Sequence, residues 1–326
     1  MNNLSPFEFF VKECTHLDVV VREEGMNNLN LICGLMGPDK VRSDLVPFIF
    51  DRLASDVEER DQVLLAMSKN MAIVGKATGG NDHLACLVPI IEALCRSEET
   101  AVRDAIATST VTMLQNNSVS GDAAVAFVEM FERLSGPVDD GEDMFYPKYT
   151  AGKIGVEILA KATGAHRSAV LTNFSNLVRH EVLLVRHSAV VGILGAAQVL
   201  QSDVAALEVV FGFFTASLND VAESVRVLAT AQLCGVAKCI GQSTAAASVL
   251  PLVALACGNA SWRVRQAVAA TLSECADCFP DVEVAKHLYP PTLALLQDPE
   301  EDVRALACSA IPAFASKVRI CVICVM

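Results

Sequence analysis

The chain of 326 residues is 52% hydrophobic but only 6% aromatic, and it carries a net charge of −13. This acidity argues against non-specific binding to nucleic acid or to an anionic membrane surface. The mean hydropathy is positive, yet no run of about 18 uncharged apolar residues indicates a membrane-spanning helix. No secretory signal is visible, so the twelve cysteines predict reduced, buried thiols in a cytoplasmic or nuclear protein.

The first predicted helix begins close to the N-terminus. Ser5 and Glu8 have the spacing of a capping box, and Pro6 fits the first helical position. Further along the chain, apolar helices with proline near their start recur. These starts are at residues 45–48, 87–90, 250–252 and 289–291. Proline is tolerated there because the N–H that it lacks would have no partner in the first turn.

A Val-Arg dipeptide marks a repeat along the chain. The arginines of the copies that keep one phase, called marker arginines below, are Arg22, Arg103, Arg186, Arg226, Arg265 and Arg304. The last four are 40, 39 and 39 residues apart. The longer intervals of 81 and 83 residues each hold two units, with Leu64 and Lys148 at the missing places. A period near 40 predicts about eight units.

The residues after each marker arginine predict one buried helix face. Offsets of 3, 7 and 10 from the marker, with valine at −1, recur on the same side of an α-helix. The apolar residues at +3 are Ala151, Ala189, Ala229, Val268 and Ala307. Those at +7 are Leu29, Ile193, Leu233, Leu272 and Ile311, and those at +10 are Ile32, Met113, Ile158, Val236 and Phe314. Six residues before the marker, Asp220, Asn259 and Asp298 suit a tight turn or a helix cap.

Each unit is therefore predicted to be a helix, a short turn and a second helix. One such pair cannot bury both apolar faces alone, whereas stacked pairs share a continuous core. The fold class expected is all-α, a right-handed α-α superhelix of about eight helix pairs forming one domain over residues 1–326. We expect a loop insertion near residues 135–147 and an irregular apolar tail over residues 317–326.

The repeat resembles a known family. The period, the paired helices and the Asp-x5-Arg spacing are similar to HEAT repeats, of the armadillo type of solenoid. Four segments, in order and in phase, resemble the scaffolding (A) subunit of protein phosphatase 2A. These segments are residues 41–48, 61–66, 98–104 and 261–265. The resemblance covers roughly residues 15 to 315.

The resemblance implies a non-catalytic scaffold without a cofactor. In that family, turns within the N-terminal repeats receive a regulatory (B-type) subunit, and the last repeats hold the catalytic phosphatase subunit. The turn residues that carry over here are Glu98, Glu99, Glu181, Arg186, Trp262 and Arg263. They are expected along one ridge, because each occupies the same place in its repeat. Residues 179–187 depart from the family turn, with a leucine for the proline and His187 for a second arginine.

The chain ends after about eight repeats. We therefore expect it to bind a regulatory subunit, and the catalytic subunit only if further C-terminal repeats exist. The alternative function is another HEAT-repeat adaptor, such as a transport receptor or an assembly scaffold. No nucleophile, phosphate-binding or metal-ligand motif points to an enzyme.

Several candidate residues keep two interpretations. The marker arginines are expected to be structural, each bonded to the next unit's acidic turn residue, with Arg186 the strongest exception. Trp262 either binds a partner or packs under the adjacent repeat. Two Cys-x2-Cys pairs, beginning at Cys275 and Cys321, have zinc-like spacing but lie far apart in the sequence, so no metal site is predicted.

Overall fold

The computed structural model describes residues 4–54, 61–137 and 145–325. These residues form α-helices, with a few short 3-10 and π-helical turns, and contain no strand. They divide into two compact units, Met1–Leu177 and Val178–Met326. The all-α class predicted from the repeat is confirmed. No helix in the described ranges is long and apolar enough to cross a membrane.

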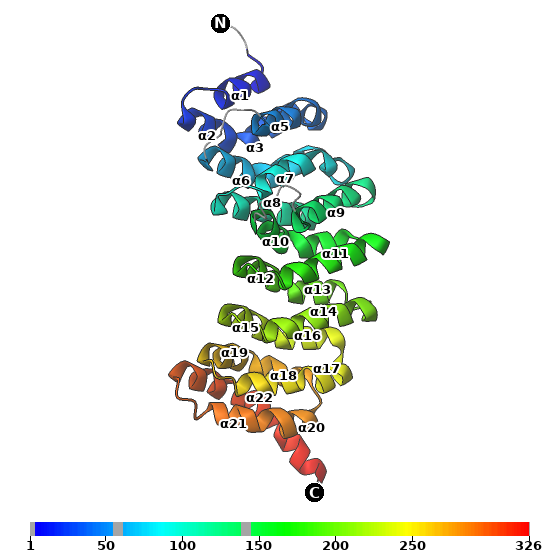
Figure 1. The fold of residues 1–326 in the computed structure, drawn as a ribbon, viewed down its shortest axis with the longest axis vertical. Helices are drawn as coiled ribbons and strands as arrows, with labels where there is room; N and C mark the ends of the chain where they lie inside the picture. The colour runs from blue at the N-terminus through cyan, green and yellow to red at the C-terminus, as the bar shows by residue number, and fades with distance from the viewer. Residues whose placement is uncertain (1–3, 55–60, 138–144, 326) are drawn as a thin grey trace. The chain divides into compact units, whose positions relative to one another are not determined.

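The first unit consists of successive helix pairs (Figure 1). The pairs are α1 (Pro6–Cys14) with α2 (Val19–Asn27) and α3 (Leu29–Met36), α5 (Val46–Ala54) with α6 (Asp61–Ala77), α7 (Val88–Cys95) with α8 (Thr100–Asn116), and α9 (Gly121–Ser135) with α10 (Phe145–Lys161). The short segments α4 (Pro38–Lys40) and η1 (Val41–Leu45) lead into α5, and η2 (Asn81–Leu87) leads into α7. Helix α11 (Gly164–Val178) ends at the unit boundary. The second helices α6, α8 and α10 contact one another in series.

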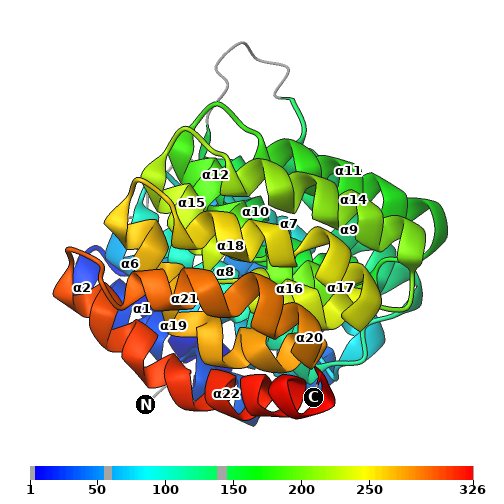
Figure 2. The ribbon, with the colours of Figure 1, turned by 90° about the horizontal axis from the view of Figure 1, so that it is seen from below.

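The second unit repeats the arrangement. It contains α12 (Leu183–Val190) with α13 (Ile193–Val199), α14 (Val204–Leu218) with α15 (Glu223–Thr230) and α16 (Leu233–Ile240), α17 (Gln242–Ser248) and α18 (Leu250–Cys257) with α19 (Trp262–Cys278), and α20 (Asp281–Glu283), η3 (Val284–Leu288) and α21 (Tyr289–Leu295) with α22 (Glu301–Val325). Figures 1 and 2 show α18 beside α21 and α19 beside α22, which the contacts between these helices confirm. Neighbouring pairs therefore share their apolar faces.

The predicted helix face forms the core. Every residue at offset +3 is fully buried, and so is every one at +7 except Ile311, which is half-buried. The residues at +10 are buried as well. The small +3 residues leave room for close contact between helices, and the low aromatic content follows from this tight spacing.

The predicted helix starts are present. Ser5 and Glu8 form a reciprocal capping box, and Pro6, Pro89, Pro251 and Pro290 lie in first turns. The chain is already wound before Pro89 and Pro290, in the 3-10 segment η2 and the π segment η3. A proline ring crowds the carbonyl four residues earlier, so the turn before it departs from α-geometry.

Three of the marker helices are broken near their middle. The interruptions fall at Asn28, at Val191 and Gly192, and at Ala231 and Gln232. The sequence pattern predicts a single helix at each place, because the apolar periodicity continues across the break. Of the other marker helices, α6, α8, α10 and α19 run through 17 residues without interruption and α22 through 25.

Two expectations about irregular segments meet different outcomes. Most of the loop insertion predicted near 135–147 lies outside the described residues, although α9 ends at Ser135 and α10 begins at Phe145. The irregular tail predicted over 317–326 is wrong for residues 317–325, because α22 continues to Val325. An apolar composition does not itself end a helix, and no residue after Pro312 is a helix breaker.

The cysteine expectation is wrong for one pair. Cys234 of α16 and Cys275 of α19 are joined in a disulfide, with Cα atoms 5.2 Å apart. Eight other described cysteines are free thiols. The stacking of successive repeats brings these two residues together although they are 41 residues apart in the sequence. Spacing along the chain therefore gave no indication of the pairing.

Candidate partner-binding turns

The marker arginines close the turns between paired helices. In six repeats the Nη1 atom donates to the carbonyl oxygens six and five residues earlier, at 2.6–3.1 Å. These carbonyls belong to turn residues that follow the end of the preceding helix, where backbone acceptors lack helical partners. The marker arginines are structural, as expected, but the contact that all six share is with their own turn and not with an acidic residue of the next unit. Arg186, expected to be the exception, makes the same contact.

A second side chain fixes each turn from the other side. The residue six before the marker accepts a hydrogen bond from the backbone N–H two residues later, at 2.8–3.2 Å. The acceptors are His16, Ser97, His180, Asp220, Asn259 and Asp298. The sequence pattern identified only the last three, because histidine and serine at this place do not match an Asp or Asn motif. Each turn is thus held by both its first residue and its marker.

Two marker arginines also join neighbouring repeats of the second unit. Arg186 makes a two-pronged ion pair with Asp220 at 2.8 and 3.1 Å, and Arg265 pairs with Asp298 at 2.6 and 2.9 Å. The four side chains are 4–14% exposed. The hydrogen bond from Arg265 lowers the pKa of Asp298 below its usual value. In the first unit Arg103 instead lies over the rings of Tyr146 and Tyr149, at 4.6 and 5.4 Å.

The predicted site residues of the first unit are exposed. Glu98 and Glu99 project from the turn before α8. Glu99 also caps this helix, because its carboxylate accepts from the Ala101 N–H at 3.3 Å. The carbonyl of Glu98 is held by Arg103 while its side chain faces solvent. Glu98 is therefore the freer of the two acidic side chains.

The turn before α12 contains one exposed and one engaged predicted residue. Glu181 is exposed, as are Leu183 and Leu184 beside it. The Arg186 side chain is 11% exposed and bonds both Asp220 and its own turn. These bonds within the chain account for the burial of the Arg186 side chain, so no bound partner is needed to explain it. A contact between Arg186 and another protein stays a prediction.

Trp262 and Arg263 form a stacked pair at the start of α19. The Arg263 guanidinium lies 4.7 Å from the centre of the Trp262 ring and 3.4 Å from Glu223 of the preceding turn. Ser261 also donates to Glu223, at 2.5 Å. Trp262 is half-buried and Arg263 exposed, so this pair presents an aromatic edge and a cation together.

The turns of the second unit form a row. Helices α12, α15 and α19, which follow three of these turns, contact one another in series, and Figure 1 shows them stacked. Residues 181 and 186 thus lie two repeats from 262 and 263, with the turn of Val221 and Glu223 between them. The family resemblance carried no site residue over to this middle turn, where Val221 is 91% exposed. A ridge that also includes Glu98 and Glu99 stays a prediction, since those residues belong to the other unit.

The described residues offer no other chemical centre at these turns. They include no group of three His, Cys, Asp or Glu side chains placed to hold a metal ion. Cys275, one of the residues with zinc-like spacing, is bonded to Cys234. What the turns provide is a set of rigid loops with different exposed side chains, which is the arrangement of a protein-binding surface.

Comparisons with known proteins agree with the repeat assignment. The HEAT repeat family matches residues 288–318. The beta isoform of the human 65 kDa regulatory (A) subunit of serine/threonine-protein phosphatase 2A is 28% identical over 202 residues, or 62% of this chain and 32% of that protein. The regulatory (A) subunit of protein phosphatase PP2A from Saccharomyces cerevisiae is 25% identical over 287 residues, or 85% of this chain and 44% of that protein. A Dictyostelium discoideum protein phosphatase 2A scaffold subunit is 23% identical over 198 residues, or 61% of this chain and 32% of that protein.

These matches span less than half the length of the relatives. Among solved structures, Kap121p bound to Pho4p has a TM-score of 0.69 and 14% identity, over 96% of this chain and 34% of that one. This likeness shows the fold alone. The resemblance to phosphatase 2A scaffolding subunits and the HEAT-type solenoid fold, both predicted from the turns, are confirmed.

Proposed function

We propose that this chain, a series of HEAT repeats similar to the scaffold subunits of protein phosphatase 2A, is a non-catalytic scaffold of a phosphatase complex. It binds a B-type regulatory subunit through the turns within its repeats. It works in the cytoplasm or the nucleus, and its task is geometric, because it holds a partner at a fixed place and orientation.

One observation carries this proposal. Every marker arginine holds its turn by the same pair of backbone bonds, while the side chains between the fixed points differ from turn to turn. Leu17, Glu98, Glu181 and Val221 stand at the same position and are all exposed. A rigid backbone loses little conformational entropy on binding, so such turns are suited to recognise a partner. The differing side chains then supply specificity.

A charge change at the first-unit turn tests the proposal. The double variant Glu98→Lys, Glu99→Gln reverses the freer charge and keeps an oxygen that can cap α8. We expect affinity for a purified B-type subunit to fall at least about fivefold, which corresponds to about 1 kcal/mol. The measurement is a titration by calorimetry, with circular dichroism to confirm the helical content.

A matched control distinguishes an effect of the turn residues from an effect of the net charge of the chain. The double variant Glu129→Lys, Asp122→Asn makes the same charge change on α9, where both residues are exposed. Its affinity should equal that of the unmodified chain. Equal affinities for all three proteins would contradict the role of the turn.

The second candidate is a transport receptor or another assembly adaptor. The fold likeness to Kap121p does not favour it, because 14% identity carries no function. Affinity capture from the native cell extract, read by mass spectrometry, distinguishes the two. Recovery of phosphatase regulatory subunits supports the scaffold, whereas recovery of cargo proteins with a small GTPase would favour the transport receptor.

A further inference from the structure

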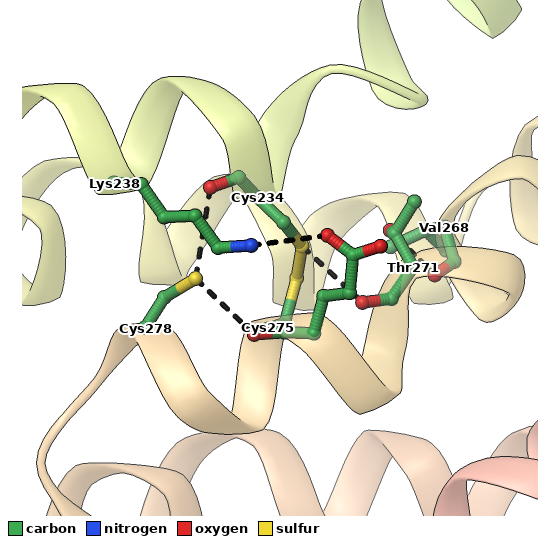
Figure 3. Close-up of a disulfide and its surroundings, with 7 residues drawn as sticks. Cys234, Lys238, Val268, Thr271, Cys275 and Cys278 are labelled. Atoms are coloured by element: carbon green, nitrogen blue, oxygen red, sulfur yellow. Dashed lines mark hydrogen bonds and ion pairs between the residues drawn. A yellow bond between two sulfur atoms is a disulfide. The ribbon is translucent and has the colours of Figure 1, made fainter.

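The interface between α16 and α19 contains a buried disulfide. Cys234 and Cys275 are 1% and 0% exposed, and Figure 3 shows their bond crossing from one repeat to the next. Cys278, one turn further along α19, lies beside the bridge, and its thiol donates to the carbonyls of Glu274 and Cys234 at 3.2 and 3.6 Å. The bridge is a covalent link between adjacent repeats, which otherwise contact each other through packing and non-covalent polar contacts.

The same interface lacks the buried ion pair of its neighbours. The preceding interface has Arg186 with Asp220, and the following one has Arg265 with Asp298. At the corresponding place Arg226 faces a turn whose first residue is Asn259, a neutral side chain that accepts from its own turn. Among the described residues Arg226 bonds only the carbonyls of Asp220 and Val221.

The ion pairs across this interface are exposed, and Ser261 donates to Glu223 at 2.5 Å in a partly buried position. Lys238 pairs with Glu274 at 3.2 Å, with side chains 55% and 66% exposed. Arg263 pairs with Glu223 at 3.4 Å, with side chains 54% and 41% exposed. Exposed pairs of this kind contribute little to stability. This interface therefore has a disulfide between α16 and α19 and no buried ion pair at its turn.

We propose that Cys234 and Cys275 form a reversible redox staple that replaces the missing ion pair between these two repeats. When the bridge is formed, the interface between α15–α16 and α19 is locked. When it is reduced, this interface becomes the loosest of the three in the second unit. The proposal concerns the chain itself and does not depend on the partner that its turns bind.

The chemistry requires a small-molecule disulfide such as glutathione disulfide. One protein thiolate attacks a sulfur of glutathione disulfide, which releases one glutathione and leaves a mixed disulfide. The second protein thiolate then attacks the protein sulfur of that mixed disulfide and releases the second glutathione. The two protons lost by the cysteines are taken up by the two glutathione thiolates. Because both cysteines are buried, exchange requires local opening of the interface.

Peptide mapping tests the pairing. Trypsin releases Cys234 in residues 227–238 and both Cys275 and Cys278 in residues 266–286. After equilibration with glutathione disulfide and alkylation, these two peptides should be recovered as one cross-linked species. Cys275→Ser should abolish the species, and the matched control Cys278→Ser should retain it. Loss of the cross-link in Cys278→Ser, or its absence from the unmodified chain, would overturn the assignment.

Stability measurements test the staple. We expect the oxidised chain to melt about 5 °C or more above the chain reduced with dithiothreitol, with slower amide exchange in α16 and α19. Asn259→Asp gives Arg226 the acidic partner found at the other interfaces. This variant should therefore raise the melting temperature of the reduced chain and shrink the redox difference. Identical melting and amide exchange of the oxidised and reduced unmodified chain would refute the staple.

Discussion

At the residue scale, the marker arginine combines two kinds of contact. Its Nη1 atom closes its own turn, and in two repeats its other nitrogens reach the aspartate that starts the next turn. Lysine has no planar fork of donors and cannot make both contacts at once. Arginine itself, rather than a positive charge, is therefore needed to make both contacts, although Leu64 and Lys148 stand at this position in two other units.

Removing one of these arginines should destabilise the second unit. Arg265→Ala leaves Asp298, which is 4% exposed, without its counter-ion, and frees two turn carbonyls. We expect the free energy of unfolding to fall by about 3 kcal/mol, measured by urea denaturation. Arg263→Ala, which removes an exposed arginine two residues away, should cost less than about 1 kcal/mol. Equal losses from the two variants would contradict the structural role.

The ionisation of Asp298 should make the free energy of unfolding depend on pH. Its pKa is lowered in the folded chain, first by the hydrogen bond from Arg265 and against an opposing effect of burial. A lowered carboxyl pKa contributes stability above the ordinary value of about 4, and this contribution is lost as the pH falls through the folded value. Asp298→Asn should reduce the loss of unfolding free energy between neutral and acidic pH. An unchanged pH profile would show that this carboxylate carries no such linkage.

At the element scale, two of the three breaks in the marker helices are held by side chains of the next repeat. Gln232 donates to the carbonyl of Val190 at 2.8 Å and accepts from the N–H of Leu194 at 2.8 Å. In the first unit Asn70, at the same offset, donates to the carbonyl of Met26 at 3.2 Å. A broken helix exposes backbone groups that would otherwise bond each other, and an amide side chain can satisfy both kinds. These two interruptions therefore lock neighbouring repeats together.

Loss of the Gln232 amide should weaken its repeat interface. Gln232→Ala leaves the half-buried Val190 carbonyl and Leu194 N–H groups without this partner, and we expect a loss of about 1–3 kcal/mol in unfolding free energy. The control is Gln266→Ala, whose side chain makes a single 3.4 Å contact with Asp302. That control should change stability by less than about 0.5 kcal/mol. Similar values for the two glutamines would contradict a locking role.

At the scale of the whole molecule, the open question is whether the two units behave as one domain. The boundary between them falls at the last residue of α11, so no linker separates them in the sequence. The single tryptophan, Trp262, reports on the second unit alone, whereas far-ultraviolet circular dichroism reports on all helices. We expect both probes to give the same urea midpoint, as for one cooperative domain. Two separated midpoints would show that the units unfold independently.

The periodicity alone determined the repeat, the buried face and the turns. Offsets of 3, 7 and 10 identify a helix face because the α-helix has a fixed period, and this information lies within each unit. The capping box at Ser5 and the prolines in first turns were equally predictable, since caps depend on neighbours only a few residues away. The family resemblance rested on the same local turns.

Contacts between repeats could be found only in the tertiary structure. The Cys234–Cys275 bridge, the Gln232 lock and the burial of Arg186 each join residues more than 30 positions apart. The breaks between α12 and α13 and between α15 and α16 could not be predicted from the sequence either, because the apolar periodicity continues across them. The apolar pattern of a helix shows which of its faces is buried. It does not show which side chain of the next repeat contacts that face. That choice depends on the offset between stacked helices, which packing sets and the one-dimensional pattern does not contain.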